Sequence, residues 1–175
     1  MRDGEFRVGL VSAEKITLRR RLSDWLRSGG SQPKLTFDAT LDPNAEDVEA
    51  VARGLRAYNN QFAGALNERK LGCFARDETG RVVGGAHGHV VWSWLYIERL
   101  WVESDLRGAG VGAQVLARIE RLALAEGVFR FHVQTTSFQA LDFYRKQGYE
   151  VYAELEDNPP GFTDYSLKKR IELNP

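Results

Sequence analysis

A short glycine-rich run beside an arginine is the segment whose residue types could do chemistry. It reads Arg107-Gly-Ala-Gly-Val-Gly-Ala113, between a stretch typical of a strand and a stretch typical of a helix. The first turn of a helix has free backbone N–H groups and carries the positive end of the helix dipole. Glycines let the backbone close around phosphate oxygens without a Cβ atom in the way, and an arginine adds a full positive charge. The segment therefore predicts a site for an anion, with a phosphate as the expected ligand.

Several interpretations compete for this segment. A dinucleotide-binding fingerprint starts at Gly108, but it needs an acidic residue about 20 positions further on, and residues 132–136 contain none. A Walker loop fails because no Gly-Lys-Ser/Thr follows. A pyrophosphate loop of the type Arg-x-x-Gly-x-Gly is filled by Arg107, Gly110 and Gly112. A glycine-rich turn without a ligand is the remaining alternative.

The elements that must position this loop follow from hydrophobic periodicity. A strand at 95–102 leads into the loop, and a helix with Val111, Val115 and Ile119 on one face leaves it. The other expected elements are a strand at 34–40, a helix at 44–62, strands at 71–76 and 81–91, a strand at 128–135, a short helix at 139–146, and a last strand pair at 149–155 and 162–171. Early hairpins and later strand–helix–strand units predict an α/β (α+β) fold, a mixed sheet with helices on both faces. We expect one domain at 34–175, preceded by an N-terminal extension at 1–33.

Composition excludes several classes of protein. The chain has 175 residues with 24 basic and 24 acidic side chains, so its formal net charge is zero. A neutral chain has no global electrostatic reason to bind nucleic acid or an anionic membrane, and no apolar run is long enough for a membrane span. Cys73 is the only cysteine, which allows no intrachain disulfide and fits a reducing compartment. We therefore expect a cytoplasmic protein with no nucleic-acid or membrane partner.

Two motifs in the right order carry a family resemblance. Arg107-x-x-Gly110-x-Gly112, after Leu100-Trp-Val102, resembles the acetyl-CoA loop of the GNAT superfamily of N-acyltransferases. The segment Ser137-Phe-Gln-Ala-Leu-Asp-Phe-Tyr144-Arg-Lys-Gln-Gly-Tyr149 is similar to that superfamily's Asn-x-x-Ala-x-x-x-Tyr-x-x-x-Gly-Phe, with Ser137 where Asn is commoner. The resemblance implies a mostly antiparallel sheet of about seven strands, splayed between the fourth and the fifth. It also implies acetyl-CoA as co-substrate and no metal.

The resemblance also implies where the co-substrate binds. In such folds the pantetheine arm enters the splay and pairs with exposed strand backbone, and the pyrophosphate sits on the N–H groups of the loop. The expected contacts are Leu100, Trp101, Val102, Arg107, Gly108, Ala109, Gly110, Val111, Gly112, Ala113 and Ser137.

Glu98 is the candidate base or water-positioner. It lies two residues before Leu100, so the two side chains should project from the same face unless a bulge intervenes. The sequence Tyr96-Ile-Glu98-Arg-Leu-Trp-Val102 is similar to the matching strand of polyamine N-acetyltransferases, in which this Glu is the proposed base. The alternative is a structural ion pair with Arg99, Arg107 or another cation.

Tyr144 is the candidate general acid. Its counterpart in the superfamily has this role, because a phenol can protonate the departing thiolate. The alternative is a core tyrosine whose hydroxyl caps a backbone carbonyl.

These residues together predict an N-acetyltransferase that moves an acetyl group from acetyl-CoA directly to a primary amine in a ternary complex. The acceptor is expected to be a small-molecule or peptide amine, and a homodimer is left open. The alternative is a catalytically inactive GNAT-like module that binds CoA or a regulatory partner. His87 and His89 share a strand face, but no further ligand follows at the spacing of a metal site.

Overall fold

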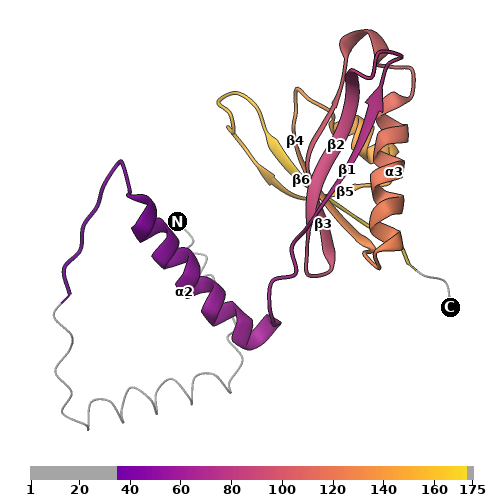
Figure 1. Cartoon of the computed structure of the whole chain (residues 1–175). Coiled ribbons are helices and arrows are strands. Elements are labelled where there is room, and N and C mark those ends of the chain that lie inside the picture. The colour runs from indigo at the N-terminus through magenta and orange to yellow at the C-terminus, as the bar shows by residue number, and fades with distance from the viewer. Residues whose placement is uncertain (1–34, 173–175) are drawn as a thin grey trace, which may run out of the picture. The chain divides into compact units, whose positions relative to one another are not determined.

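The computed structural model describes residues 35–172 (Figure 1). The chain separates into two units, Met1–Ala45 and Glu46–Pro175. The expected extension at 1–33 lies outside the described residues, so a domain boundary at residue 34 stays a prediction. No helix in the described part has both the length and the apolar character needed to cross a membrane.

The strand expected at 34–40 is not formed. Residue 34 lies outside the described range, residues 35–40 have no regular secondary structure, and Leu35 and Phe37 are exposed. An alternating pattern becomes a strand only when it finds an edge to pair with. Over residues 35–172 the sheet ends at β1 (Arg69–Arg76), which pairs with β2 (Val82–Val91). The described sheet therefore has six strands where about seven were expected.

Helix α2 (Ala45–Ala63) agrees with the helix expected at 44–62. It runs through Gly54 without a break. The ring centroids of Tyr58 and Phe62, one turn apart, are separated by 5.1 Å. The apolar side chains that the periodicity aligned, including Val48 and Leu55, are all exposed. The spacing of these residues therefore predicts the helix correctly, although the described residues do not bury them.

The six strands run in the order β1-β2-β3-β4-β6-β5. Only β3 and β4 are parallel among these pairs; the other four pairs are antiparallel. The mixed, mostly antiparallel sheet is confirmed. The remaining elements are β3 (Trp94–Val102), the 3₁₀ turn η1 (Ser104–Leu106), α3 (Val111–Ala125), β4 (Arg130–Thr136), α4 (Leu141–Lys146), β5 (Glu150–Leu155) and β6 (Asp164–Arg170).

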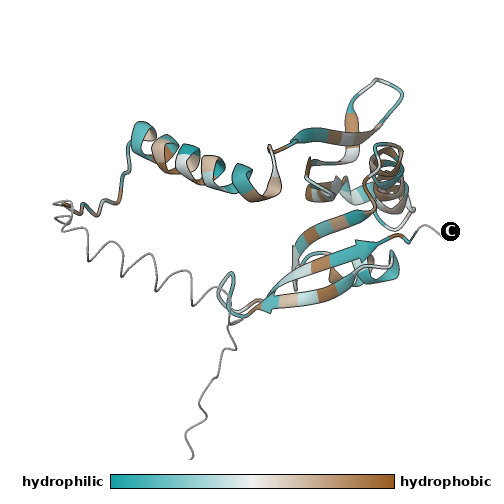
Figure 2. Ribbon diagram, turned by 90° about the horizontal axis from the view of Figure 1, so that it is seen from below, coloured by the Kyte–Doolittle hydropathy of each residue, from teal (hydrophilic) through white to brown (hydrophobic). Residues whose placement is uncertain are grey.

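Helix α3 lies along one face of the sheet and packs against β1, β2 and β3 (Figure 1). Leu116 and Ile119 of α3 are buried in one cluster with Leu95 of β3 and Phe131 of β4. Figure 2 shows the matching hydrophobic stretches on α3 and on the strands. Because this face carries the core, the side chains that alternate with the core residues on β1–β3 lie on the opposite face, which we call the open face.

A buried carboxylate fixes α3 to the end of the sheet. Glu120 is 7% exposed; it accepts a hydrogen bond from the Tyr149 hydroxyl at 2.8 Å and pairs with Lys169 Nζ at 2.7 Å. Both carboxylate oxygens therefore have a partner, as a buried charge requires. Burial and the adjacent carboxylate raise the pKa of Tyr149.

The hairpin of β2 and β3 contains a bulge that depends on a glycine. Arg99 pairs with His87 and Ile97 pairs with Gly88, so Glu98 is the extra residue on β3. A Cβ atom on Gly88 would lie 2.0 Å from the carbonyl oxygen of Tyr96. Gly88 therefore lets the two backbones approach closely at the bulge.

Candidate active site

The parallel strands β3 and β4 stay together for only four residue pairs. These run from Trp94–Arg130 to Ile97–Val133, and the strands then separate. From Arg99 to Val102, β3 keeps its pairing with β2, and no described strand lies on its other side. Backbone groups on that side can pair with an extended ligand. The strands expected at 95–102 and 128–135, the fourth and fifth of the expected sheet, are β3 and β4 here, because the strand at 34–40 is not formed. The splay expected between them is confirmed.

The glycine loop lies beyond the end of β3 and opens α3. Gly108 and Gly110 have left-handed backbones, with φ of 80° and 79°, and a Cβ atom on either would meet nothing within 4 Å. Gly110 is the N-cap of α3, and no side chain caps that helix. The N–H groups of Val111, Gly112 and Ala113 in the first turn are thus available to an anion. Ala109, which the sequence predicted as a contact of the co-substrate, lies in the same loop.

Arg107 is anchored across the same corner. Its Nε donates a hydrogen bond to the carbonyl oxygen of Val102 at 3.0 Å, in a part-buried position. This bond ties the loop to the end of β3. The terminal guanidinium nitrogens make no hydrogen bond with a described residue, so they can still contact an anion.

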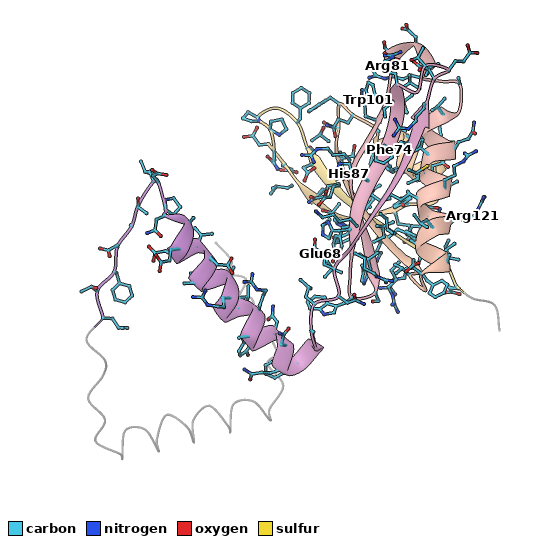
Figure 3. All side chains as sticks on the ribbon, viewed as in Figure 1. Glu68, Phe74, Arg81, His87, Trp101 and Arg121 are labelled. Carbon is cyan, nitrogen blue, oxygen red and sulfur yellow. The ribbon has the colours of Figure 1, made fainter. Side chains whose placement is uncertain are left out.

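The other two cofactor candidates on β3 face opposite ways. Leu100 packs against the core cluster, whereas the Trp101 side chain is exposed. Figure 3 shows Trp101, Phe74 and His87 on the open face and Arg121 on the outside of α3. Only Trp101 of these two offers its side chain to a ligand on the open face, and Leu100 can offer its backbone.

At the other side of the splay, Ser137 is hydrogen-bonded to the backbone of Thr163. Its N–H donates to the Thr163 carbonyl at 2.8 Å, and its hydroxyl accepts a hydrogen bond from the Thr163 N–H at 3.3 Å. The neighbouring Thr136 hydroxyl is buried and has no hydrogen-bond partner among the described residues. An unpaired buried hydroxyl is costly, so Thr136 is the better candidate for a polar contact with a bound ligand. Its residue type alone carried no signal of this.

Glu98 does not project from the same face as Leu100, because the bulge intervenes. Its carboxylate lies on the open face, where Oε1 is 2.8 Å from His89 Nδ1 and Oε2 is 3.3 Å from His87 Nδ1. The alternative ion pairs with Arg99 and Arg107 are not among the contacts of the described residues. Glu98 is also the first residue of β3 beyond the last pair with β4. Its carboxylate therefore stands on the open face at the start of the splay.

The two histidines were set aside as a separate pair on a strand, and the structure joins them to Glu98. A hairpin signal could have found this contact. The loop between β2 and β3 has two residues, Trp92 and Ser93, and this register brings residue 98 near residue 87. Together these side chains line a cleft of about 410 Å³ that also includes Glu68 and Phe74.

Tyr144 lies on α4 within the core and is 4% exposed. Its ring contacts those of Phe143 and Tyr149, and Phe143 in turn lies 3.5 Å from where a Cβ atom of Gly112 would be. This chain of contacts places α4 beside the glycine loop. Burial raises the pKa of Tyr144 to about 12, so the phenol is neutral at physiological pH. No described residue forms a hydrogen bond with its hydroxyl, which excludes the carbonyl-capping alternative within this part of the chain.

Comparisons with known proteins give a family and a fold. The sequence model described as the acetyltransferase (GNAT) family matches residues 34–149. Blasticidin-S acetyltransferase of Streptomyces morookaense is 42% identical over 99 residues, which are 56% of this chain and 73% of that protein. The crystal structure of an acetyltransferase from Bacillus cereus aligns with a TM-score of 0.72 and 28% identity, over 77% of this chain and 98% of that one. A Bacillus anthracis protein solved with acetyl coenzyme A shares the fold, with a TM-score of 0.51 and 18% identity over 57% and 61% of the two chains.

Proposed function

Because the chain belongs to the GNAT family of acetyltransferases, we propose that it transfers the acetyl group of acetyl-CoA directly to a primary amine in a ternary complex. The observation that carries this proposal is the splay that opens at Glu98, between a glycine loop at one end and a cleft on the open face. An extended donor in the splay and an amine in the cleft would meet at that carboxylate.

The residues present fit the donor. The left-handed Gly108 and Gly110 leave open space where side chains would stand, and the first turn of α3 has no side-chain cap. We assign the pyrophosphate to the N–H groups of residues 108–113 and to Arg107. The unpaired Thr136 hydroxyl and the free side of β3 would hold the pantetheine arm. When bound, acetyl-CoA supplies the acyl group as an activated thioester.

Two side chains serve the proton transfers of this reaction. Amine attack needs a neutral nitrogen, and an alkylammonium ordinarily has a pKa of about 10. Glu98 would organise removal of that proton, as the base or by holding the group that accepts it. Tyr144 would donate a hydrogen bond or a proton to the departing sulfur. With its pKa raised to about 12, hydrogen-bond donation is favoured over complete proton transfer.

The acceptor is proposed to be a small cationic amine. The residues that line the cleft include two acids, Glu68 and Glu98, against one lysine, Lys70. Phe74 adds an aromatic side chain, so the cleft suits an ammonium on an apolar or aromatic body. The 42% identity to blasticidin-S acetyltransferase makes blasticidin S the first acceptor to test.

The test is thiol release from acetyl-CoA over a panel of amines. The panel contains blasticidin S, a polyamine, an amino acid and a peptide with a free N-terminus. We expect release that depends on one of the small cationic amines, with the acetylated product identified by mass. Binding of acetyl-CoA in calorimetry without release in the presence of any amine would instead support an inactive CoA-binding module.

The glycine loop gives a separate prediction about donor affinity. Gly110→Ala should weaken acetyl-CoA binding about tenfold in calorimetry, because a Cβ atom would enter the cradle and the left-handed backbone costs roughly 1–2 kcal/mol with a side chain. Gly80→Ala is the matched control. Gly80 also has a positive φ, of 86°, and open space around it, but it lies in the turn between β1 and β2. Equal acetyl-CoA affinities for the two variants would remove the loop from the donor site.

A further inference from the structure

Both oxygens of Glu98 are engaged by imidazole nitrogens, and this limits what the carboxylate can do. His89 Nδ1 lies 2.8 Å from Oε1 and His87 Nδ1 lies 3.3 Å from Oε2. An ionised carboxylate can only accept hydrogen bonds. His89 Nδ1, which is hydrogen-bonded to this carboxylate, must therefore carry the hydrogen. In a neutral imidazole the lone pair is then on Nε2.

An imidazole is also better matched to the reaction than a carboxylate. A carboxyl group ordinarily titrates near 4 and an imidazole near 6.5, so near pH 7 the imidazole is the stronger base. An imidazole whose Nδ1–H donates a hydrogen bond to a carboxylate, and whose Nε2 is free, resembles the pair of orienting carboxylate and general base in sites that activate a nucleophile.

We propose, resting on the acetyltransferase function above, that His89 Nε2 is the proton acceptor for the acceptor amine and that Glu98 is the residue that positions it. His89 is the better held of the two histidines. It makes the shorter contact with Glu98, and its ring stacks on Tyr96 at 5.6 Å with 14° between the planes. His89 lines the same cleft as Glu98, with 28% of its side chain exposed.

The proton transfer balances without a further reactant. The amine enters as an ammonium ion; one N–H bond breaks, its electron pair stays on nitrogen, and the proton forms a bond to Nε2. The imidazolium is paired with the Glu98 carboxylate and returns the proton to solvent through the cleft. The product of this step is a neutral amine beside the splay.

Other titratable or charged groups border the cluster on each element packed against it. His132 neighbours Tyr96 at 5.1 Å, and burial lowers its pKa, so it stays neutral near pH 7. Glu68 precedes β1 and Lys70 lies on β1. The groups on the following strands are His87 on β2, Tyr96 and Arg99 on β3, and His132 on β4.

The test compares pH profiles of kcat/KM for His89→Gln, Glu98→Gln and the double variant, with the acceptor found on the amine panel. His89→Gln should lose about 100-fold in kcat/KM and its acidic limb, a typical loss for a general base. The double variant should lose no more than the His89→Gln variant, since residues acting as a unit are not additive. His132→Gln is the control and should keep the wild-type profile. A His89→Gln variant that keeps the acidic limb while Glu98→Gln loses it would make Glu98 the base and overturn the proposal.

A second measurement does not depend on turnover. Nitrogen NMR of the wild-type protein, assigned by comparison with the His89→Gln variant, should show neutral His89 protonated on Nδ1. Protonation on Nε2 would overturn the proposal. These results are distinguishable from failure of the proposed function, which would appear as a wild-type protein that acetylates no amine.

Discussion

Replacing Gly88 with alanine is expected to destabilise the protein by about 3 kcal/mol, the upper end for overpacking a close contact. The new Cβ atom would lie 2.0 Å from the Tyr96 carbonyl oxygen, 2.9 Å from its carbonyl carbon and 3.0 Å from the Ile97 Cα atom. All three are backbone atoms, so no side-chain rotation can relieve the clash. The strands of the hairpin must separate instead, which breaks ladder hydrogen bonds. Urea unfolding measures the loss.

Gly84→Ala on the same strand is the matched control for this prediction. Its Cβ atom would come no closer than 3.3 Å, to the Trp101 carbonyl oxygen, so a small local shift can accommodate it. We expect Gly84→Ala to cost less than about 1 kcal/mol. Because Gly88 lies at the bulge formed by Glu98, Gly88→Ala should also lower turnover under conditions where the protein is still folded. Equal stability of the two glycine variants would show that the bulge does not depend on Gly88.

The elements around the loop were predictable because their signals are local. Helix α3 follows from the spacing of Val111, Val115 and Ile119, and its start follows from the glycines before it. The strand at 34–40 was predicted wrongly, because its alternation says nothing about whether a sheet edge is available. Pairing depends on residues distant in sequence, and periodicity does not contain that information.

The site shows the same division. The glycine loop and the splay could be expected from a motif and a resemblance. The placement of Glu98 and Leu100 on opposite faces could not, because it requires a bulge between two residues that alternation alone puts on one face. The contact of Glu98 with His87 and His89 follows from the two-residue loop of the hairpin, and the bulge determines that Leu100, further along β3, points to the core. Gly88, near the middle of β2, was the one local sign of the bulge.

Replacing Tyr144 with phenylalanine is expected to lower kcat about 100-fold, with acetyl-CoA affinity within about twofold of wild type. A side chain that assists a proton transfer typically contributes this much or more. The folded structure should tolerate the change, because the Tyr144 hydroxyl has no hydrogen bond with a described residue and its ring packs in the core. We therefore expect the free energy of unfolding to change by less than about 1 kcal/mol.

Tyr149→Phe is the control that should behave in the opposite way. Its hydroxyl donates to the buried Glu120 carboxylate, so its loss should cost about 2 kcal/mol of stability, a typical value for a hydrogen bond to a charged group. Turnover of the folded Tyr149→Phe protein should stay close to wild type, since this hydroxyl is already committed to Glu120. Unfolding and turnover, measured on both variants, separate a catalytic phenol from a structural one. Equal kcat for Tyr144→Phe and wild type would remove Tyr144 from the chemistry.

The pKa of Tyr144 also fixes the sign of its pH effects. Burial raises it from 10 to about 12, so the folded protein holds this proton more tightly than the unfolded chain. The stability that this provides is fully present below pH 10 and is lost as the pH rises from 10 to 12. Over the ordinary assay range the phenol stays protonated, so Tyr144→Phe should lower the whole kcat profile without shifting either limb. An alkaline limb that disappears in the Tyr144→Phe variant would require a phenol of much lower pKa, and would contradict the buried environment from which the donor role is argued.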